Sequence, residues 1–311
     1  MDKEHRKLII LGSGPAGLAA AIYAARAELN PLVFTGMVLY GQASTTETIE
    51  NYPGFPKGIG GNDLGQLFQV QAERFGAQIE YAQVDCLNLR ARPFEVSTYG
   101  KEYTADAIIL ATGADNRKLD VPGEIEFVGR GVSYCATCDG WFYKDKDIHV
   151  VGGGDSALEE ALFLTRFARS ITIIHRRDTL RAGAILENRA RNNPKIRFMW
   201  NSVVRKIGGE EKVKHLELEN LLTKEKQTIP TDGLFIFIGH TPNSGLFKDQ
   251  VSTSEDGTVI VDQTYQTSIK GVFAAGEICD PHFRQVITSA GMGASAAISA
   301  VKCLEQWECG A

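Results

Sequence analysis

A glycine-rich motif placed directly after an apolar strand is the feature that most constrains the fold of this chain. Gly12 to Gly17 reads G-x-G-x-x-G, follows the apolar run 7–11 and precedes an alanine-rich helical segment at 18–29. A second apolar run at 31–34 comes next. In such a strand–turn–helix–strand context the first glycine allows a tight turn, the second lets a pyrophosphate approach the backbone, and the third lets helix and strand pack closely. The segment therefore predicts a dinucleotide-binding unit.

A second copy of the same pattern follows about 140 residues later. The apolar run 148–151 leads into Gly152-x-Gly154-x-x-Ala157, then a helical segment at 158–169 and an apolar run at 171–174. Two such units predict two dinucleotide sites in one chain.

The ends of the second strands distinguish the two units. The first copy ends in Thr35 and Gly36 and has no acidic residue there to hold an adenosine ribose. The second ends in His175-Arg176-Arg177, with Arg181 one turn later. Arginines at this position pair with the 2′-phosphate of NADP, where an acidic residue would favour NAD. The second unit is thus expected to take NADP, with a merely solvated basic cluster as the alternative.

The remaining apolar runs indicate how the two units are connected. The strand 107–110 ends in Ala-Thr-Gly at 111–113 and is followed by a predicted linker at 116–122, and 239–243 is read as the return linker. Another buried strand at 271–275 leads to Gly276 and Glu277, and a small-residue helix opening at 284–291 runs to about residue 306. We therefore expect an α/β protein with two Rossmann-like three-layer nucleotide-binding domains, the second inserted into the first. The expected boundaries are 1–116 with 244–311 for the outer domain and 117–243 for the inserted one, and 195–238 is expected to form a meander of strands.

A pair of cysteines carries the candidate redox chemistry. Cys135 and Cys138 are separated by two residues and followed by Asp139, just before the second glycine motif. Two thiols at this spacing can close a small, readily reduced disulfide ring, and an adjacent carboxyl group can serve as acid or base during thiol exchange. The alternative, a zinc module, needs four ligands, and no second pair complements this one.

Composition excludes several classes of function. The chain has 311 residues, 43% of them hydrophobic, and a net charge of −5, which gives no electrostatic footprint for nucleic acid or anionic membranes. No apolar run is expected to reach the roughly 18–20 residues of a membrane span, and no signal peptide is expected. Six cysteines with one close pair form no disulfide framework, which favours a reducing cytoplasm.

Taken together, these motifs resemble those of the low-molecular-weight thioredoxin reductases. The combination of CxxCD just ahead of GxGxxA and HRRDxxRA is highly specific. Matching segments run nearly end to end and are residues 12–17, 45–54, 111–113, 135–140, 152–157, 175–182, 239–243, 271–276 and 284–291.

The resemblance implies a homodimer with FAD in the outer domain, NADPH in the inserted domain and thioredoxin as the protein substrate. In this family a hydride passes from NADPH to the flavin, which then reduces the disulfide, and the two domains rotate between the steps. By resemblance, Cys138 contacts the flavin, Cys135 attacks the substrate, and Asp139 protonates the leaving thiolate. The resemblance assigns FAD contacts to Gly12, Ser13, Gly14, Pro15, Ala16, Gly17, Thr35, Gly36, Gly41, Gln42, Thr46, Asn51, Val84, Ala111, Thr112, Gly113, Gly276, Glu277, Arg284, Gln285 and Val286. It assigns NADP contacts to Gly152, Gly154, Asp155, Ser156, Ala157, His175, Arg176, Arg177 and Arg181.

Departures from the family pattern lie on the flavin side. Tyr40 stands where the family usually has glycine, Glu277 where it has aspartate, and Ala294 where it has cysteine, and the tail 304–309 is unfamiliar. Beside neutral drift, one hypothesis is that Tyr40 or the Trp307 tail covers the flavin and changes which donor or acceptor reaches it. The alternative function is a flavin-dependent disulfide reductase of the same fold with another electron donor, such as ferredoxin, or another dithiol or disulfide substrate.

Overall fold

The computed structural model describes residues 3–308 and divides into two compact units. Unit 1 comprises Met1–Asp115 and Thr241–Ala311, and unit 2 comprises Asn116–His240. The expected boundaries at 116/117 and 243/244 lie one and three residues further along the chain.

A largely parallel sheet forms the centre of unit 1. Its described strands follow the order β3-β2-β1-β6-β5-β4, with β17 also paired to β6. Their bounds are β1 (Glu4–Leu11), β2 (Leu32–Phe34), β3 (Gln78–Glu80), β4 (Cys86–Asn88), β5 (Phe94–Thr98), β6 (Lys101–Leu110) and β17 (Val272–Ala274). The helical elements are α1 (Pro15–Arg26), the 3-10 helix η1 (Gly41–Thr45), α2 (Gly61–Arg74) and α6 (Val286–Glu308). Because β1, β6 and β17 are mutually parallel, their carboxyl ends lie at one edge of the sheet.

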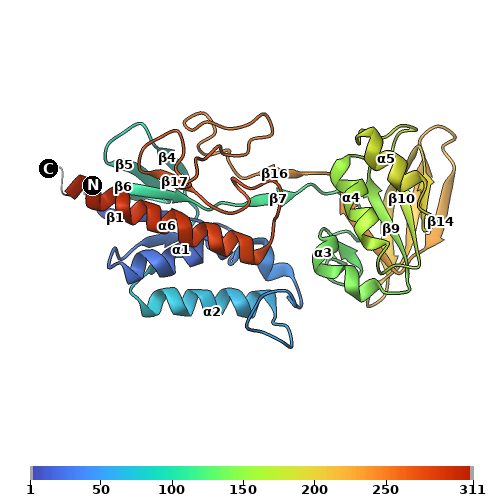
Figure 1. Cartoon of the computed structure of the whole chain (residues 1–311), viewed down its shortest axis with the longest axis horizontal. Helices are drawn as coiled ribbons and strands as arrows, with labels where there is room; N and C mark the ends of the chain where they lie inside the picture. The colour runs from blue at the N-terminus through green and yellow to red at the C-terminus, as the bar shows by residue number, and fades with distance from the viewer. Residues whose placement is uncertain (1–2, 309–311) are drawn as a thin grey trace. The chain divides into compact units, whose positions relative to one another are not determined.

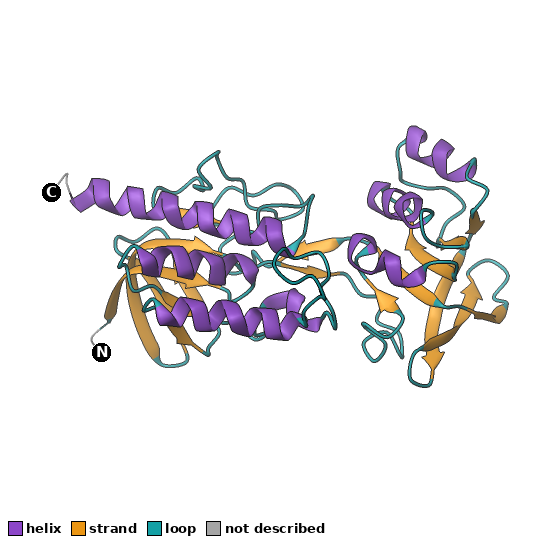
Figure 2. Ribbon diagram, turned by 60° about the horizontal axis from the view of Figure 1, so that its bottom comes forward, coloured by secondary structure: helices purple, strands orange, loops and turns teal. Residues whose placement is uncertain are grey.

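Two apolar cores give unit 1 its layers. Helices α1, α2 and α6 lie along one face of the sheet (Figures 1 and 2). There Ala20 and Ala24 of α1 and Ala296, Ala297 and Ala300 of α6 are fully buried, and such small side chains let helices and strands approach closely. The opposite face is covered by a second cluster that includes Leu87, Phe94, Phe247, Val251 and Val259.

Unit 2 has the same three-layer plan. Its parallel sheet follows the order β11-β10-β9-β15-β8 and comprises β8 (Val132–Ser133), β9 (Asp147–Gly152), β10 (Ser170–Ile174), β11 (Ile196–Met199) and β15 (Gly233–Phe237). One face packs on helices, which are α3 (Ala136–Asp139), the 3-10 helix η2 (Gly140–Tyr143), α4 (Asp155–Leu164) and α5 (Ala184–Arg191). The other packs on an antiparallel sheet of β12 (Ser202–Gly209), β13 (Val213–Asn220) and β14 (Lys226–Pro230). The expected class, α/β with two Rossmann-like domains of which the second is inserted in the first, is confirmed.

The predicted meander at 195–238 is only partly correct. Its middle strands β12 to β14 are antiparallel, whereas β11 and β15 join the parallel sheet beside β10 and β9. All five residues of β15 are buried, which is what a central parallel strand requires because helices and a second sheet cover both its faces. Helix α5 was not expected from the sequence.

Two short strands connect the units. These are β7 (Ala114–Asn116) and β16 (His240–Pro242), which pair with each other. On the unit 2 side the Arg117 N–H donates to Gly239 O at 3.0 Å, and on the unit 1 side the Asn243 N–H donates to Gly113 O at 3.0 Å. The two points at which the chain leaves and re-enters each unit are therefore adjacent.

Helix α6 differs from one sequence expectation. Its stretch Val286–Trp307 is long and apolar enough to cross a membrane by length and composition, although no such run was expected. The core helix of a soluble protein can share this length and composition. The helix packs against α1 in unit 1, with Ala296, Ala297 and Ala300 fully buried.

Candidate active site

The first glycine loop forms a cradle whose middle glycine faces open space. A Cβ on Gly12, which has φ +112°, would lie 2.2 Å from Ala111 O, and a Cβ on Gly17 would lie 1.9 Å from Gly12 O. Both positions therefore need glycine for packing. A Cβ on Gly14 would meet nothing closer than Gly41 Cα at 4.0 Å. The fold itself does not demand a glycine there, and a ligand that approaches the backbone closely would.

The N-terminus of α1 opens onto this loop. Gly14 is the N-cap, Pro15 occupies the first turn, and neither a side-chain cap nor an acidic residue in the first turn competes for the free N–H groups. A helix N-terminus of this kind binds phosphate through its N–H groups and its dipole. The residues of the loop therefore fit the pyrophosphate of a dinucleotide.

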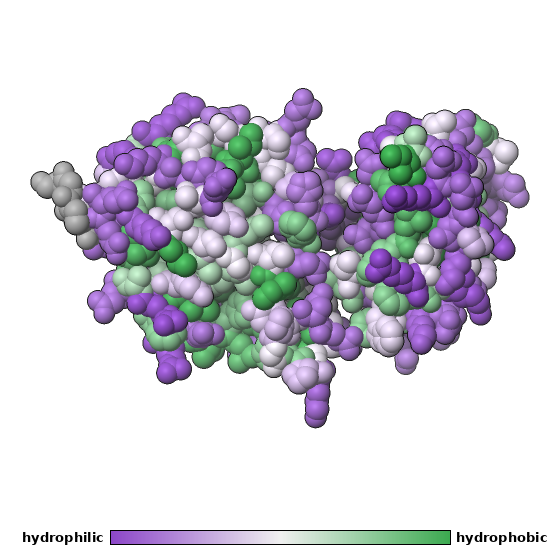
Figure 3. All heavy atoms as spheres, in the orientation of Figure 1, coloured by the Kyte–Doolittle hydropathy of each residue, from purple (hydrophilic) through white to green (hydrophobic). Residues whose placement is uncertain are grey.

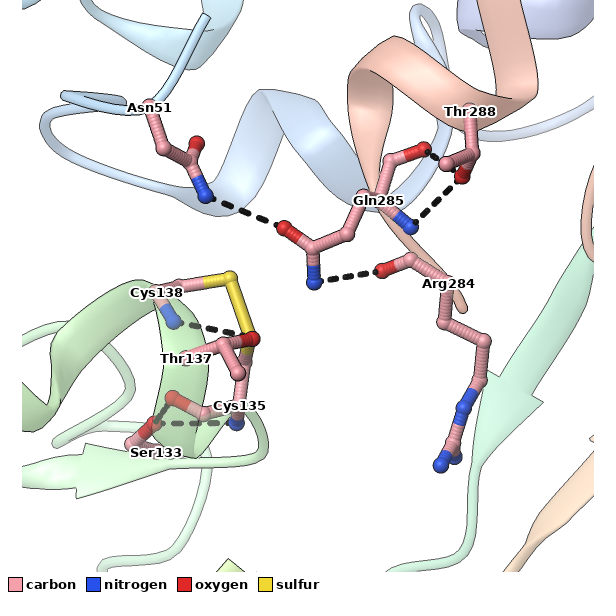
Figure 4. The surroundings of a disulfide bond; sticks show 8 residues. All are labelled: Asn51, Ser133, Cys135, Thr137, Cys138, Arg284, Gln285 and Thr288. Carbon is pink, nitrogen blue, oxygen red and sulfur yellow. Dashed lines mark hydrogen bonds between the residues drawn. A yellow bond between two sulfur atoms is a disulfide. The ribbon is translucent and has the colours of Figure 1, made fainter. Parts of the chain in front are cut away.

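Other residues assigned to the flavin are gathered by hydrogen bonds within unit 1. The Gln42 amide donates to Asp115 Oδ1 at 2.8 Å, and the Asn51 amide donates to Gln285 Oε1 at 3.0 Å (Figure 4). Thr112 Oγ1 donates to Asn243 O at 2.9 Å. These bonds link segments far apart in the sequence at the edge where β6 and β17 end.

Some of the assigned residues can contribute only their backbone. Val84 is buried in the core under the sheet, and the side chain of Ala111 is likewise buried. Thr35 is buried at the end of β2, where its carbonyl accepts a hydrogen bond from Ser13 Oγ. Gly36 and Gly113 have φ of +71° and +68°, and a Cβ on either would meet nothing within 4 Å, so their surroundings are open.

Glu277 is a mostly buried carboxyl group at the end of this edge. Its pKa is raised to about 7, mainly by burial, against the opposing effect of the Arg284 guanidinium and with smaller contributions from Asp280 and Asp115. The group is thus close to half protonated at neutral pH, which an aspartate or glutamate in water is not.

The second glycine loop, in unit 2, repeats the pattern of the first. A Cβ on Gly152 would lie 2.5 Å from both Ala157 Cβ and Phe237 O, whereas a Cβ on Gly154 would meet nothing within 4 Å. Asp155 and Ser156 follow at the start of α4, and Asp155 Oδ1 accepts from the Gly183 N–H at 2.7 Å. This loop also fits a dinucleotide.

His175 has a different place from the arginines that follow it. Its ring is buried beneath the loop, so that a Cβ on Gly153 would lie 2.2 Å from it, and its Nε2 lies 3.1 Å from Thr179 O. Burial lowers its pKa, so the ring stays neutral and supports the loop from below. Arg176, Arg177 and Arg181 are exposed after the end of β10, and guanidinium groups at such a place could pair with a phosphate group.

The two cysteines form a disulfide at the start of α3. Cys135 is the N-cap of this helix, and its Sγ accepts from the Cys138 N–H at 3.1 Å and lies 3.3 Å from Thr137 Oγ1. Ser133 Oγ, which is buried, accepts from the Cys135 N–H at 3.1 Å and donates to Cys135 O at 3.2 Å (Figure 4). Ser133 fixes the backbone of Cys135 from both sides, and sequence reasoning missed it because serine is common and carries no motif.

Asp139 lies on the same turn as the disulfide. Burial raises its pKa above the usual range, and the nearby Ser133 hydroxyl group opposes this shift. A carboxyl group of raised pKa retains its proton more readily, which suits a proton donor to a thiolate.

The hypothesis that Trp307 covers the flavin is wrong. Its ring lies against Gly271 at the amino end of β17, where a Cβ on Gly271 would be 2.5 Å from it, with Arg92 at 4.9 Å and Lys270 at 5.5 Å from the ring centre. The glycine cradle is at the opposite, carboxyl edge of the sheet. Cys309, the last residue of the unfamiliar tail, lies outside the described residues.

Tyr40 does not form a cover either. Its side chain is buried against Gly65 of α2, and its hydroxyl group donates to Gln69 Oε1 at 3.0 Å. The ring is held between helices of unit 1.

Two dinucleotide cradles on separate α/β units, one unit also carrying a CxxC disulfide, define a pyridine nucleotide-dependent disulfide oxidoreductase. Comparison with known proteins agrees, since the pyridine nucleotide-disulphide oxidoreductase family matches residues 6–293. The chain belongs to this family, whose members use flavin and nicotinamide cofactors.

Individual relatives are more specific. The chain is 50% identical over 299 residues to the thioredoxin reductase of Streptomyces coelicolor, covering 95% of this chain and 92% of that one. It is 50% identical over 303 residues to the bifunctional thioredoxin reductase/thioredoxin of Mycobacterium leprae, covering 96% of this chain and 66% of the relative. The crystal structure of thioredoxin reductase from Streptococcus pyogenes superposes with a TM-score of 0.93 at 41% identity, covering 98% of this chain and all of that one.

Proposed function

We propose that this protein is a thioredoxin-disulfide reductase that uses FAD in unit 1 and NADPH in unit 2. The observation that carries the proposal is the Cys135–Cys138 disulfide in the unit that also holds an intact nucleotide loop. FAD, when bound, supplies the electron pair that it accepts from the nicotinamide. The relatives named above support thioredoxin as the oxidised substrate.

The side chains then divide the thiol chemistry between them. Two electrons and two protons convert the disulfide to two thiols. The Cys135 thiolate attacks the thioredoxin disulfide, forms a mixed disulfide and releases one thioredoxin thiolate, which Asp139 protonates. Cys138 then loses its proton to solvent and attacks Cys135 Sγ as a thiolate, which restores the disulfide and releases the second thioredoxin sulfur as a thiolate that takes up a proton from solvent. Ser133 keeps the Cys135 backbone in place throughout.

NADPH is preferred to NADH in this proposal because of the exposed arginines. Arg176, Arg177 and Arg181 follow the end of β10, and no acidic side chain replaces them at the position that would hold a 2′-hydroxyl group. Guanidinium groups pair with phosphate through charge-assisted hydrogen bonds.

Two exposed apolar regions support the proposed partners. In unit 2, Trp141 and Phe142 follow the redox turn and are 58% and 44% exposed, as a docking surface for a protein substrate requires. In unit 1, apolar side chains gather over α2 (Figure 3), among them the exposed Leu67, Val70 and Phe75. Patches of this kind mark protein interfaces, and we assign this one to the homodimer. A cytoplasmic location, with its reducing thiol pool, completes the proposal.

An anaerobic titration with NADPH tests the electron route. Bleaching of the flavin absorbance followed by two new thiols per chain, with no new thiols in Cys138→Ser, is the expected result. A flavin that bleaches with dithionite but not with NADPH would instead favour another donor, such as ferredoxin. Failure to reduce thioredoxin after normal bleaching would favour another disulfide substrate.

A further inference from the structure

Tyr40 has a backbone conformation that a bulky residue adopts only when its surroundings enforce it. Its φ is +64° and ψ is 8°, in the left-handed region. Gly41 follows with φ +66°. Non-glycine residues in this region are uncommon, and for a bulky side chain such strain often accompanies a functional constraint.

The ring of Tyr40 is anchored on α2. Gly65 leaves the space that the ring occupies, since a Cβ there would lie 2.3 Å from Tyr40 Cγ. Leu18, Leu64 and Phe68 belong to the same buried cluster, and Tyr40 is 7% exposed. A glycine at position 40 would relieve the strain but would lose all of this packing.

The hydroxyl group completes the anchor through a buried amide. It donates to Gln69 Oε1 at 3.0 Å, and Gln69 is itself only 7% exposed. The Gln69 amide donates to Glu73 at 2.8 Å and to the Tyr81 hydroxyl at 2.6 Å, so its orientation is fixed from the other side. A satisfied buried network of this kind is costly to break.

The backbone of Tyr40 connects this anchor to the glycine cradle. Its N–H donates to Ser13 Oγ at 3.2 Å, and Ser13 Oγ donates to Thr35 O at 3.2 Å. One residue further on, a Cβ on Gly41 would lie 3.2 Å from Gly14 Cα, so the two loops touch. Apart from this contact with Gly41, the space around Gly14 is open. The position of residue 40 therefore sets the shape of the wall beside the open cradle.

We propose that Tyr40 is a positioning residue for the dinucleotide of unit 1. Its ring and hydroxyl group, held on α2, keep Gly41 and Gln42 against the Gly12–Gly17 loop before the dinucleotide arrives, which reduces the ordering cost of binding. The inference rests on the proposed binding of FAD in unit 1, and it replaces the hypothesis that Tyr40 controls access to the flavin.

Direct measurement of FAD affinity tests the proposal without thioredoxin or NADPH. Apo-protein is titrated with FAD and followed by flavin fluorescence, with the release rate measured by dilution. Tyr40→Phe removes one hydrogen bond and is expected to raise the dissociation constant about 5- to 10-fold, and Tyr40→Gly is expected to raise it about 100-fold. Most of the change should appear in the release rate. Tyr99→Phe, at a 96% exposed tyrosine of the same unit, is the matched control and should bind FAD like wild type.

Two further readouts separate positioning from a general loss of stability. Gln69→Leu should weaken FAD binding to a similar extent as Tyr40→Phe, and the double variant should be no worse than either, because both act through one bond. With saturating FAD, the turnover number of Tyr40→Phe should return to the wild-type value. Wild-type FAD affinity, within about twofold, in both Tyr40→Phe and Tyr40→Gly would overturn the inference. Absence of FAD binding in the wild type and in Tyr99→Phe as well would overturn the proposed function and this inference with it.

Discussion

At the scale of single residues, the environment of the Asp139 carboxyl group predicts a specific chemical role, that of a proton donor. It lies one residue beyond the disulfide, and burial raises its pKa while Ser133 opposes the shift. The group therefore carries its proton to a higher pH than a free aspartate does, next to the thiols that exchange protons.

Asp139→Asn removes this proton donor and leaves the shape of the turn unchanged. Thioredoxin reduction should slow by roughly 10²-fold or more, the usual contribution of a positioned acid, whereas flavin reduction by NADPH should keep its wild-type rate. The wild-type rate of thioredoxin reduction should fall as pH rises through the raised pKa of Asp139, and the variant should lose this limb of the profile. Stopped-flow traces over a pH series measure both steps. An unchanged pH profile in the variant would show that another group supplies the proton.

In unit 1, the raised pKa of Glu277 leads to a prediction about stability. Its pKa is about 7 in the folded protein against 4.5 in the unfolded chain, because burial favours the neutral form. The folded state binds this proton more tightly, so the stabilisation is complete below pH 4.5 and is lost as pH rises to about 7. Glu277→Gln should therefore be more stable than wild-type apo-protein at about pH 8, by at most roughly 3 kcal/mol, with little difference at or below about pH 4.5.

Urea unfolding of the two apo-proteins at several pH values measures the difference. Glu255→Gln, at an exposed loop carboxylate of the same unit, serves as the control. If the free energies of unfolding of Glu277→Gln and wild type changed in parallel from about pH 4.5 to pH 8, the raised pKa of Glu277 would not be the cause of the pH dependence.

At the scale of elements, the glycine loops could be predicted from sequence because their chemistry is local. The spacing Gly12, Gly14, Gly17 encodes a tight turn, an open face and a close helix contact, and the structure places each glycine in that role. The same holds for Gly152 and Gly154. The disulfide was also predictable, because its two cysteines are three positions apart.

Contacts between distant segments were not predictable. Ser133 becomes important only because it bonds to both backbone groups of Cys135, and Trp307 belongs to the opposite sheet edge only because α6 runs that far along α1. Likewise β15 is an apolar run that fits a meander as well as a central strand until its neighbours β8 and β9 are known.

A matched pair of alanine substitutions in the second glycine loop separates ligand binding from packing. A Cβ on Gly154 meets nothing within 4 Å, so Gly154→Ala should fold with a free energy of unfolding within about 1 kcal/mol of wild type, while its NADPH affinity should fall at least about 10-fold. Gly153→Ala would meet the His175 ring at 2.2 Å and should destabilise unit 2 by about 1–3 kcal/mol. Nicotinamide fluorescence titrations and urea unfolding separate the two effects. Wild-type NADPH binding by Gly154→Ala would show that no ligand approaches this backbone.

At the scale of the whole molecule, the two units are built as separate folding units that share one chain. Each has its own pair of apolar cores on the two faces of its own sheet. The crossing points are adjacent on both sides, since Arg117 bonds to Gly239 in unit 2 and Gly113 bonds to Asn243 in unit 1. If unit 2 is excised, the two chain ends created in unit 1 therefore lie next to each other, and so do the two ends of unit 2.

Residues 116–240 expressed alone should fold cooperatively and bind NADPH but not FAD, because the core and the nucleotide loop of this fragment are both internal to it. Residues 1–115 joined to 241–311 by a short Gly-Ser linker should bind FAD but not NADPH. The cost of closing so short a loop is small, since it grows only slowly with length. Circular dichroism during urea unfolding reports folding, and fluorescence titration with each dinucleotide reports binding.

A fragment 116–240 with Arg176 and Arg177 replaced by alanine is the control and should fold normally with weakened NADPH binding. If the wild-type fragment folds but binds FAD instead, the assignment of one cofactor to each unit is reversed; if neither fragment folds, the two units depend on each other for stability in a way that their separate cores do not indicate.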